Sequence, residues 1–450
     1  MHIHILGICG TFMGGIAQIA RALGHEVTGS DQNVYPPMSD QLEKMGIELS
    51  TGYKPEHLQP APDQVIIGNT LSRGNPALEY VLNHQLPYFS GPEWLYQEVL
   101  KDKHVLAVSG THGKTTTTTI LTWILEFAGY HPGFLIGGVA ENFGISACYT
   151  DSNYFVIEAD EYDTAFSDKR SKFIHYHPKT LIINNIEFDH ADIFHDIAAI
   201  RREFQHLLRI LPEQARVIYP ENDAEVRKVL DMGCWSETVS FAGAESDWMI
   251  SEQDKDFQHF SVMHKGQKTG NVSWHLLGEH NANNALAAII AADHIGVPVS
   301  KACQALSKFK SVKRRLECIF DSNGIRVNDD FAHHPTAITL TLKAMRQHAG
   351  EARIIAIMEP RSNTMKMGVH ADTLASSLKD ADLVLIYQAD NVGWNIAEHM
   401  DELGDRCRVF TDIEAIVNAI AEEQRNGDFI VVMSNGGFGG IHDKLIKVLS

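Results

Sequence analysis

A lysine between a glycine and a run of threonines is the strongest chemical signal in the sequence. The segment SGTHGKTTT at 109–117 follows the apolar stretch HVLAV and precedes a second one, ILTWILEFAG. A short strand, a glycine turn and a helix in this order are typical of a phosphate-binding loop, because N–H groups at a helix start point toward an anion. Lys114 would reach the β- and γ-phosphates, and Thr115 would offer a hydroxyl to Mg²⁺.

The loop departs from the general pattern GxxxxGK[ST], which has a glycine where this chain has Val108. We interpret it as a shorter variant, GTHGKT. The alternative is a glycine turn that carries a lysine by chance. Five consecutive threonines, Thr115 to Thr119, argue against that alternative, because they are poor helix formers and phosphate and metal binding explains them better than packing. The residues expected to contact ATP here are Gly110, Thr111, His112, Gly113, Lys114, Thr115 and Thr116.

Acidic and histidine side chains follow two other expected strands. Glu158 and Asp160 end YFVIEAD, and Asp189 and His190 come just after KTLIINNI. In open parallel sheets a ligand binds at the carboxyl ends of the strands. A carboxylate and an imidazole near a triphosphate can hold Mg²⁺ and neutralise developing charge. Each signal is common by itself, and the neighbouring phosphate loop makes it informative.

The elements that must position these residues alternate between strand and helix. The chain has 450 residues, which is too long for one hydrophobic core. Alternation along the chain predicts an α/β fold with parallel sheets. We expect three consecutive α/β domains: a Rossmann-like one at 1–103, a P-loop ATPase-like one at 104–313 and a second Rossmann-like one at 314–450. Shorter, more polar strands at 237–277 suggest hairpins at a sheet edge.

Composition excludes several classes of function. The net charge is −19, with 57 acidic against 38 basic residues, which argues against a nucleic-acid or membrane-surface role. The sequence shows no run of 18 apolar residues and no basic leader at its start. The six cysteines are scattered and form no CxxC pair. A reducing cytoplasm fits best.

The motifs, taken in order, resemble the Mur ligase family. They are GTHGKTT, EADE, NNIEFDH, GEHNANNALAA, RR and DDFAHHPT, and they extend over the whole chain. The resemblance implies a bacterial cytoplasmic enzyme that uses ATP and Mg²⁺ to activate a carboxylate as an acyl phosphate and to couple it to an amine. The first domain would bind a UDP-sugar, the second ATP and Mg²⁺, and the third the amine. No obligatory protein partner is implied.

The resemblance also implies roles for single residues. Lys114, Glu158 and His190 match the catalytic set, and Thr115, Glu158 and His190 would serve the metal. The nucleotide-contacting residues that match outside the loop are Asn281, Asn284, Arg315 and Asp330. Asn281 and Asn284 lie one helical turn apart, on one face. The same helix start can also be a simple N-cap.

The N-terminal loop GICGTFMGGIA resembles the UDP-muramate-binding start of one branch of the family. The residues expected at the UDP-sugar are Gly7, Gly10, Thr11, Met13, Gly14, Ser30 and Asp31. The loop is also a weak dinucleotide motif, with Cys9 in place of a glycine and Asp31 placed like a ribose-binding acid. An NAD-dependent oxidoreductase is therefore an alternative, although it leaves the phosphate loop unexplained. A nucleotide-regulated or motor ATPase is another, and it would hydrolyse ATP without a UDP-sugar.

A missing lysine indicates the branch. Several family members carry a carbamylated lysine that bridges two metals, and the corresponding stretch at 202–217 has none. This is similar to the branch that acts on UDP-N-acetylmuramate. Four segments resemble members that add the murein tripeptide L-alanyl-γ-D-glutamyl-meso-diaminopimelate: 90–95, 161–173, 359–368 and 434–442. The alternative is the ligase that adds L-alanine to UDP-N-acetylmuramate in peptidoglycan synthesis.

The amine substrate, here called the acceptor, supplies a physical argument about its own binding site. The tripeptide carries three carboxylates, whereas free alanine carries only one. Its site should therefore have several basic side chains and an open, glycine-lined wall. The residues predicted to bind the acceptor are Arg361, Lys366, Asn435, Gly436 and Gly437. Lys169, Arg170 and Lys172 form a second basic cluster. The alternative is that these are solvated charges and an ordinary glycine turn.

Overall fold

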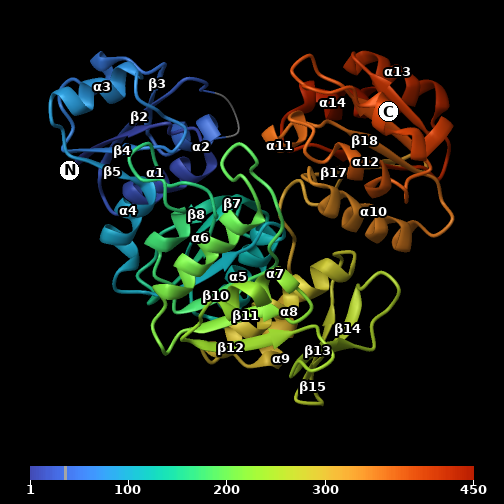
Figure 1. Ribbon diagram of the computed structural model, residues 1–450, viewed down its shortest axis with the longest axis horizontal. Helices are drawn as coiled ribbons and strands as arrows, with labels where there is room; N and C mark the ends of the chain where they lie inside the picture. The colour runs from blue at the N-terminus through green and yellow to red at the C-terminus, as the bar shows by residue number, and fades with distance from the viewer. Residues whose placement is uncertain (35–37) are drawn as a thin grey trace.

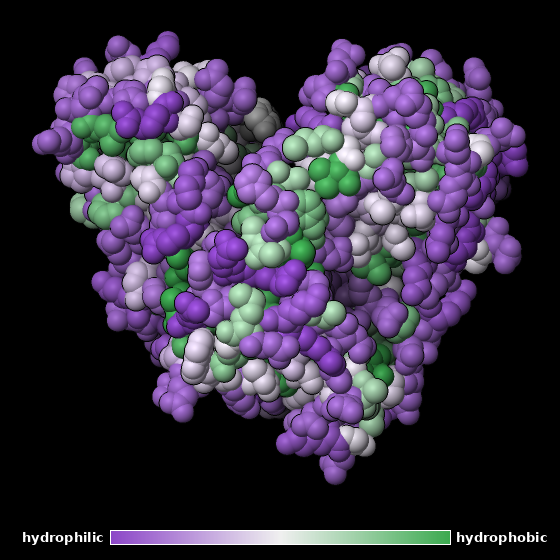
Figure 2. Space-filling model, in the orientation of Figure 1, coloured by the Kyte–Doolittle hydropathy of each residue, from purple (hydrophilic) through white to green (hydrophobic). Residues whose placement is uncertain are grey.

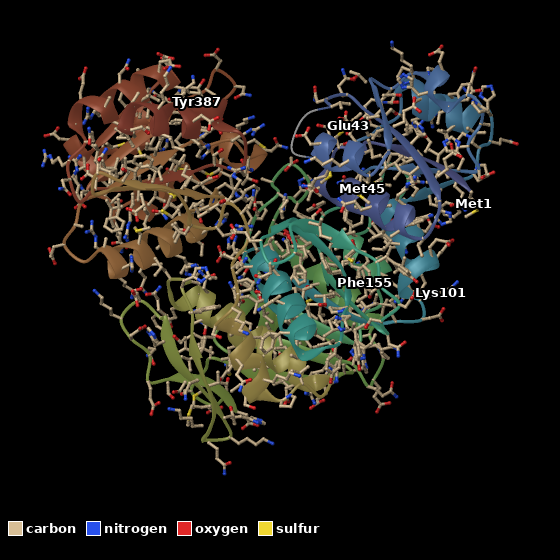
Figure 3. The ribbon with its side chains drawn as sticks, turned by 180° about the vertical axis from the view of Figure 1, so that it is seen from behind. Met1, Glu43, Met45, Lys101, Phe155 and Tyr387 are labelled. Atoms are coloured by element: carbon tan, nitrogen blue, oxygen red, sulfur yellow. The ribbon has the colours of Figure 1, made fainter. Side chains whose placement is uncertain are left out.

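The computed structural model describes residues 1–34 and 38–450, and within them the strands gather into three sheets, one in each lobe of the molecule. Figure 1 shows the N-terminal and C-terminal lobes standing side by side above the central lobe. In the same orientation, Figure 2 shows a notch between the two upper lobes. From behind, Phe155 lies within the central lobe and Tyr387 in the C-terminal lobe (Figure 3). The predicted class, three α/β units in series, is confirmed.

The N-terminal lobe holds a parallel sheet in the order β3-β2-β1-β4-β5. Its strands are β1 (His2–Leu6), β2 (Glu26–Asp31), β3 (Glu48–Thr51), β4 (Gln64–Ile67) and β5 (Tyr88–Ser90). Its helices are α1 (Thr11–Ala22), α2 (Met38–Lys44), η1 (Pro55–Leu58), α3 (Pro76–Asn83), α4 (Gly91–Leu95) and η2 (Tyr96–Leu100). The loop between β1 and α1 therefore lies at the carboxyl edge of the sheet, where a ligand binds in such folds.

The central lobe has the strand order β15-β14-β13-β12-β11-β10-β6-β9-β7-β8. Its strands are β6 (His104–Ser109), β7 (Gly133–Ala140), β8 (Ile145–Cys148), β9 (Tyr154–Glu158), β10 (Thr180–Ile183), β11 (Arg216–Pro220), β12 (Glu237–Phe241), β13 (Trp248–Ser251), β14 (His259–His264) and β15 (Gln267–Ser273). Its helices are α5 (Lys114–Ala128), η3 (Lys172–His175), α6 (Ile197–Arg209), α7 (Ala224–Asp231), α8 (Glu279–His294) and α9 (Val299–Leu306). The middle strands are parallel. The expected edge hairpins are confirmed for β13–β15, whereas β12 still pairs in parallel.

The C-terminal lobe has the order β16-β17-β21-β18-β19-β20, with only the β16–β17 pair antiparallel. Its strands are β16 (Glu317–Ser322), β17 (Ile325–Asp330), β18 (Ile354–Met358), β19 (Leu383–Tyr387), β20 (Cys407–Phe410) and β21 (Phe429–Met433). Its helices are α10 (Pro335–Ala349), α11 (Asn363–Lys366), α12 (Ala371–Ser377), η4 (Ala397–His399), η5 (Asp401–Arg406), α13 (Ile413–Glu423), η6 (Phe438–Gly440) and α14 (Ile441–Leu449). Alternate residues of β18 enter two separate cores, as expected for a strand covered by helices on both faces.

The N-terminal and central lobes share a hydrophobic cluster, whereas the C-terminal lobe has core clusters of its own. Helix α1 packs closely on β7 and β8, since a Cβ on Gly15 would lie 3.1 Å from the Ala147 Cβ. One hydrophobic cluster runs from Ile3 in the N-terminal lobe to Val217 in the central lobe. The two core clusters of the C-terminal lobe lie wholly within it. Among the described residues, no helix is long and apolar enough to span a membrane.

Candidate active site

The phosphate loop connects β6 to α5, and two glycines give it its shape. Gly110 has φ +124° and Gly113 has φ +79°, both in the region that favours glycine. A Cβ on Gly110 would lie 2.9 Å from the Asn185 carbonyl oxygen. The loop is braced by the end of β10, because the N–H of His112 donates to Asn185 Oδ1 at 2.8 Å. The N–H of Thr111 also donates to the Asn185 carbonyl oxygen, at 3.2 Å, so the end of β10 fixes the shape of the loop.

Lys114 is buried at the centre of this loop and faces acidic side chains. Its Nζ donates to the Gly110 carbonyl at 2.7 Å and to Glu161 Oε2 at 2.9 Å, and it lies 3.7 Å from Asp160 Oδ1. Burial favours the neutral amine, but these carboxylates outweigh it and hold the pKa of Lys114 above its usual range. The side chain is therefore held as a positive charge within the loop.

Glu161 is the acidic residue that the sequence analysis missed. Its side chain is 2% exposed and lies between Lys114 and His190, whose Nε2 is 3.6 Å from Glu161 Oε1. Lys114 and His190, predicted from separate motifs, thus meet on one carboxylate. The available signal was the last acid of EADE, one position beyond the two that we singled out.

Thr115 and Glu158 form an oxygen-rich pair beside the loop. The Thr115 hydroxyl donates to Glu158 Oε1 at 3.0 Å, and Glu158 Oε2 accepts from the Gly137 N–H at 2.7 Å. Burial, with Asp160 nearby, raises the pKa of Glu158. A Cβ on Gly137 would lie 2.7 Å from the Glu158 carboxylate, so a side chain there would displace that carboxylate. A hydroxyl and one or two carboxylates next to a triphosphate fit Mg²⁺, which keeps its remaining positions for phosphate and water.

The remaining threonines of the run pack inside the protein. Thr118 and Thr119 donate their hydroxyls to the carbonyls of Lys114 and Thr115, one turn earlier. The Thr117 hydroxyl accepts from Asn184 Nδ2 at 3.0 Å. All three are fully buried. Contacts inside the protein therefore account for Thr117 to Thr119, since Thr118 and Thr119 bond back to the helix and Thr117 bonds to Asn184. Ligand binding by Thr115 and Thr116 stays a prediction.

The two asparagines predicted to contact the nucleotide line different cavities. Asn284 lines a cavity of about 220 Å³ between the central lobe and α10, and a Cβ on Gly113 would lie 2.8 Å from its Oδ1. Asn281 lines a second cavity of about 430 Å³ and donates to the Leu277 carbonyl at 2.8 Å. His280 and Asn283 also line the first cavity, and helical spacing from Asn281 did not identify them.

Arg315 reaches from the C-terminal lobe to the phosphate loop. Its Nη2 donates to the Thr115 hydroxyl at 3.3 Å, and its guanidinium lies 5.0 Å from the ring centre of Phe331. Asp330 accepts from the Leu316 and Ala332 N–H groups, both at 2.8 Å, and it is buried. Burial raises the pKa of Asp330, although Arg315 opposes the shift. Asp330 thus braces the turn that presents Arg315, and its contact with the nucleotide stays a prediction.

The predicted UDP-sugar residues meet at the β1–α1 loop. Gly7 has φ +84°, and the Cys9 N–H donates to Asp31 Oδ2 at 2.9 Å, which holds the loop against the end of β2. A Cβ on Gly14 would lie 2.3 Å from Met38 Sδ, so the Met38 side chain of α2 packs directly on α1 at this glycine. The other predicted residues lie along the same edge: Gly10 at the N-cap of α1, Thr11 and Met13 in its first turn, and Ser30 in β2.

Of the predicted acceptor residues, Arg361 and Gly436 lie in contact. A Cβ on Gly436 would overlap the Arg361 guanidinium, at 1.2 Å from Nη1, whereas Gly437 faces open space. Asn435 Oδ1 is buried without a hydrogen-bond partner in the described structure. Lys366 ends α11 nearby in sequence, half-buried.

The residues of the second basic cluster, Lys169, Arg170 and Lys172, are less available to bind a substrate carboxylate. Lys169 pairs with Asp163 at 2.6 Å and Arg170 with Asp168 at 2.7 Å, both at the surface. Lys172 alone is buried, with Nζ 4.1 Å from the ring centre of Tyr162 and 4.8 Å from that of Phe12. Burial lowers the pKa of Lys172. The solvated-charge interpretation therefore fits Lys169 and Arg170 better than it fits Lys172.

Comparison with known proteins gives the family. Three family models match in order: "Mur ligase family, catalytic domain" at residues 2–102, "Mur ligase middle domain" at 108–292 and "Mur ligase, glutamate ligase domain" at 314–436. A UDP-N-acetylmuramate–L-alanyl-γ-D-glutamyl-meso-2,6-diaminoheptandioate ligase of Escherichia coli K12 is 55% identical, over 100% of this chain and 98% of its own. A UDP-N-acetylmuramate–L-alanine ligase of Acetivibrio thermocellus is 31% identical, over 99% and 96%.

This chain is also similar to a solved structure. A murein peptide ligase from Psychrobacter arcticus has a TM-score of 0.76 and 47% identity, over 100% of this chain and 98% of its own. Three α/β domains with this phosphate site define an ATP-dependent, ADP-forming ligase that makes an amide bond. The chain belongs to the Mur ligase family.

Proposed function

We propose that the protein joins the tripeptide L-alanyl-γ-D-glutamyl-meso-diaminopimelate to UDP-N-acetylmuramate, with ATP converted to ADP and phosphate, and that it serves peptidoglycan recycling. The observation that carries this proposal is the 55% identity, over the whole chain, with a ligase named for that tripeptide. The L-alanine-adding relative at 31% identity supports the alternative less well.

In the first step the lactyl carboxylate of UDP-N-acetylmuramate attacks the γ-phosphorus of ATP. The bond from that phosphorus to the ADP oxygen breaks, which leaves an acyl phosphate. Lys114, held by the Gly110 carbonyl, is positioned to neutralise charge on the transferring phosphoryl oxygens. Arg315 lies beside Thr115, where it would contact the same phosphates. Thr115 and Glu158, with His190 nearby, would hold Mg²⁺, which screens the phosphate charge when bound.

In the second step the alanyl amine of the tripeptide attacks the acyl carbon and phosphate leaves. The amine must be neutral to attack, and the proton that it loses as the amide forms is balanced on the departing phosphate, which leaves as hydrogen phosphate. No covalent bond to the protein is required. Water must be excluded, because it would hydrolyse the acyl phosphate. The C-terminal lobe covers the loop through Arg315, and its hydrogen bonds to the central lobe support a closed arrangement.

The acceptor would bind at the C-terminal lobe. Arg361, which lies against Gly436, offers a guanidinium to bind a carboxylate of the tripeptide. The Asn435 amide oxygen, which has no partner among the described residues, can accept a hydrogen bond from the tripeptide. The Lys366 side chain and the open backbone at Gly437 complete the proposed binding site for the tripeptide. In this proposal the UDP-sugar lies in the N-terminal lobe, at 1–103, and ATP in the central lobe, at 104–313.

The test is phosphate release from ATP and Mg²⁺ with UDP-N-acetylmuramate present. The tripeptide should support strong release and free L-alanine little. Without the UDP-sugar, release should be close to background. Faster release with L-alanine than with the tripeptide would overturn the acceptor assignment, and release that needs no UDP-sugar would overturn the ligase assignment itself.

A further inference from the structure

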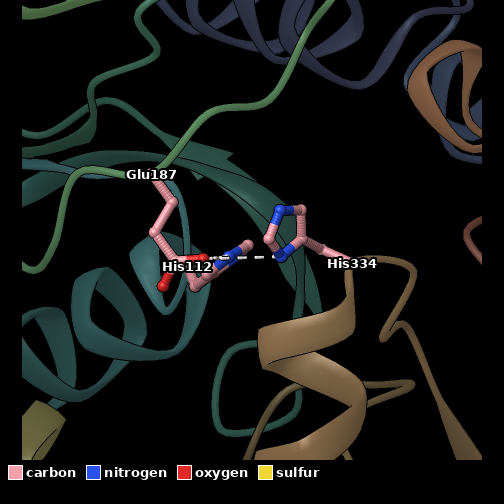
Figure 4. Close-up of side chains that lie close together, drawn as sticks. All are labelled: His112, Glu187 and His334. Atoms are coloured by element: carbon pink, nitrogen blue, oxygen red, sulfur yellow. Dashed lines mark ion pairs between the residues drawn. The ribbon is translucent and has the colours of Figure 1, made fainter. Parts of the chain in front are cut away.

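Three side chains from distant parts of the chain converge beside the phosphate loop. His112 comes from the loop itself, Glu187 from the segment after β10, and His334 from the N-cap of α10 in the C-terminal lobe. Figure 4 shows the three pointing toward one another. His112 Nε2 lies 3.5 Å and His334 Nδ1 lies 3.6 Å from Glu187 Oε2. All three ligand atoms lie within 4.8 Å of one another.

The hydrogen bonds around the cluster leave one of the two histidine nitrogens without a partner and occupy the other. His112 Nε2 is buried and has no hydrogen-bond partner. His334 Nε2 lies 3.4 Å from the Phe188 carbonyl oxygen, so that nitrogen carries the proton. The other ring nitrogen, Nδ1, is then unprotonated, and its lone pair accepts a long bond of 3.3 Å from the Thr336 N–H, which a bound metal ion would displace. A carbonyl that fixes the tautomer of a histidine is the usual outer partner of a metal ligand.

The spacing is close to what a small divalent ion requires. Ligand atoms at 2.0–2.1 Å from a tetrahedral Zn²⁺ lie about 3.4 Å apart, and the two distances to Glu187 already agree with this. Only the two histidine nitrogens need to approach further. The Glu187 side chain is about one third exposed, which leaves room for a water as fourth ligand. We propose that His112, Glu187 and His334 form a binding site for a transition-metal ion of the Zn²⁺ type.

This site differs from the proposed Mg²⁺ site in chemistry and in position. Two imidazoles and one carboxylate favour Zn²⁺, Co²⁺ or Ni²⁺ over Mg²⁺, which prefers oxygen ligands. Its residues are not Thr115, Glu158 or His190. A bound ion would tie the phosphate loop to α10, two segments of different lobes (Figure 4). It would therefore hold the C-terminal lobe against the loop whether or not ATP is present.

The test uses the full chain without nucleotide, freed of metal by a chelator and kept in excess Mg²⁺. Zn²⁺ binding is measured by titration calorimetry, and Co²⁺ binding by its visible absorption. Glu187→Gln keeps the oxygen that accepts from the Thr336 hydroxyl at 2.6 Å but removes the charge. His334→Asn keeps an N-cap side chain for α10 but removes the ring. His333→Gln is the matched control, because His333 lies next in sequence and its Nδ1 faces the Phe331 carbonyl instead.

We expect one Zn²⁺ per chain in the wild type and in His333→Gln. Affinity should fall at least about 100-fold in Glu187→Gln and in His334→Asn, since losing a direct ligand exceeds the 10- to 100-fold effect of an outer partner. The six cysteines are common to all variants, so they do not distinguish them. Equal Zn²⁺ affinity in all four proteins, or no saturable binding in the wild type, would overturn the proposal. Neither readout depends on the ligase reaction.

Discussion

At the scale of single residues, the site depends on charges that are buried together. Lys114 and Glu161 are both nearly inaccessible and lie 2.9 Å apart. A buried pair contributes little net stability, but removing one partner leaves the other charge uncompensated. Substituting an exposed loop lysine would affect catalysis alone. Because Lys114 is paired with the buried Glu161, its substitution should affect the stability of the fold as well.

Lys114→Ala should therefore reduce kcat by more than about 1000-fold and lower the free energy of unfolding by about 3–5 kcal/mol. The double variant Lys114→Ala with Glu161→Gln should recover much of that stability without recovering activity. Phosphate release and urea unfolding measure the two effects. A single variant as stable as the wild type would show that Glu161 is not buried against Lys114 in solution.

A buried histidine in β1 predicts a pH dependence. His4 contacts Thr28 Oγ1 at 2.8 Å and Ser30 Oγ at 3.1 Å, and burial lowers its pKa from 6.5 to about 3. The neutral ring is therefore favoured in the folded state. Its contribution is fully present above pH 6.5 and is lost as the pH falls toward 3. Each pH unit in that window costs up to about 1.4 kcal/mol.

His4→Gln, which keeps polar groups facing Thr28 and Ser30, should flatten the decline in unfolding free energy between pH 6.5 and 4. Denaturant unfolding at several pH values measures the slope for both proteins. His84, exposed at the end of α3, gives a control substitution that should leave the slope unchanged. Identical slopes for the wild type and His4→Gln would assign the pH dependence to other groups.

At the scale of elements, a feature could be predicted from the sequence when the residues that produce it lie close together in the chain. The phosphate loop was predictable because strand, glycines, lysine and helix are contiguous from His104 to Ala128. Gly137 was missed, because the side chain that it makes room for, Glu158, lies on the neighbouring β9. Periodicity placed Asn281 and Asn284 on one face, but two cavities divide that face between them. Pairing across a sheet and between lobes leaves no periodic signal in a single segment.

The glycine loop after β21 offers a comparison between neighbours. A Cβ on Gly436 would displace the Arg361 guanidinium, whereas one on Gly437 would meet nothing within 4 Å. Gly436→Ala should raise the KM for the tripeptide by about tenfold or more, equivalent to at least about 1.4 kcal/mol, with a much smaller change in the KM for ATP. Gly437→Ala, whose Cβ would meet no protein atom within 4 Å, should leave Arg361 in place, so a rise in the tripeptide KM there would come from contact with the tripeptide itself. Steady-state kinetics with each substrate varied in turn measure this, and equal increases in both KM values would place Arg361 outside the acceptor site.

At the scale of the whole molecule, the N-terminal and central lobes share a hydrophobic core, and the C-terminal lobe is attached mainly by polar contacts. The Thr364 hydroxyl donates to Asp189 Oδ1 at 2.9 Å, and Asn363 Nδ2 donates to Asp192 Oδ2 at 2.9 Å. Burial opposes ionisation of Asp189, but His190 and its neighbours hold its pKa below the usual range. Hydrogen bonds to charged groups can break and re-form without exposing a core. The C-terminal lobe is therefore the one expected to move during the reaction.

Thr364→Val removes the hydroxyl but keeps the shape of the side chain, and it leaves Asp189 without that donor. A hydrogen bond to a charged group contributes about 1.5–3 kcal/mol, so kcat/KM should fall about 10- to 100-fold and the radius of gyration without ligands should increase. Thr373→Val is the matched control, because Thr373 is exposed in α12 of the same lobe and its hydroxyl donates only to the His370 carbonyl at 3.2 Å. Small-angle scattering with and without ATP and UDP-N-acetylmuramate measures the shape. If Thr364→Val scatters like the control in both conditions, the contact at Asp189 does not hold the lobes together, and closure must depend on the substrates alone.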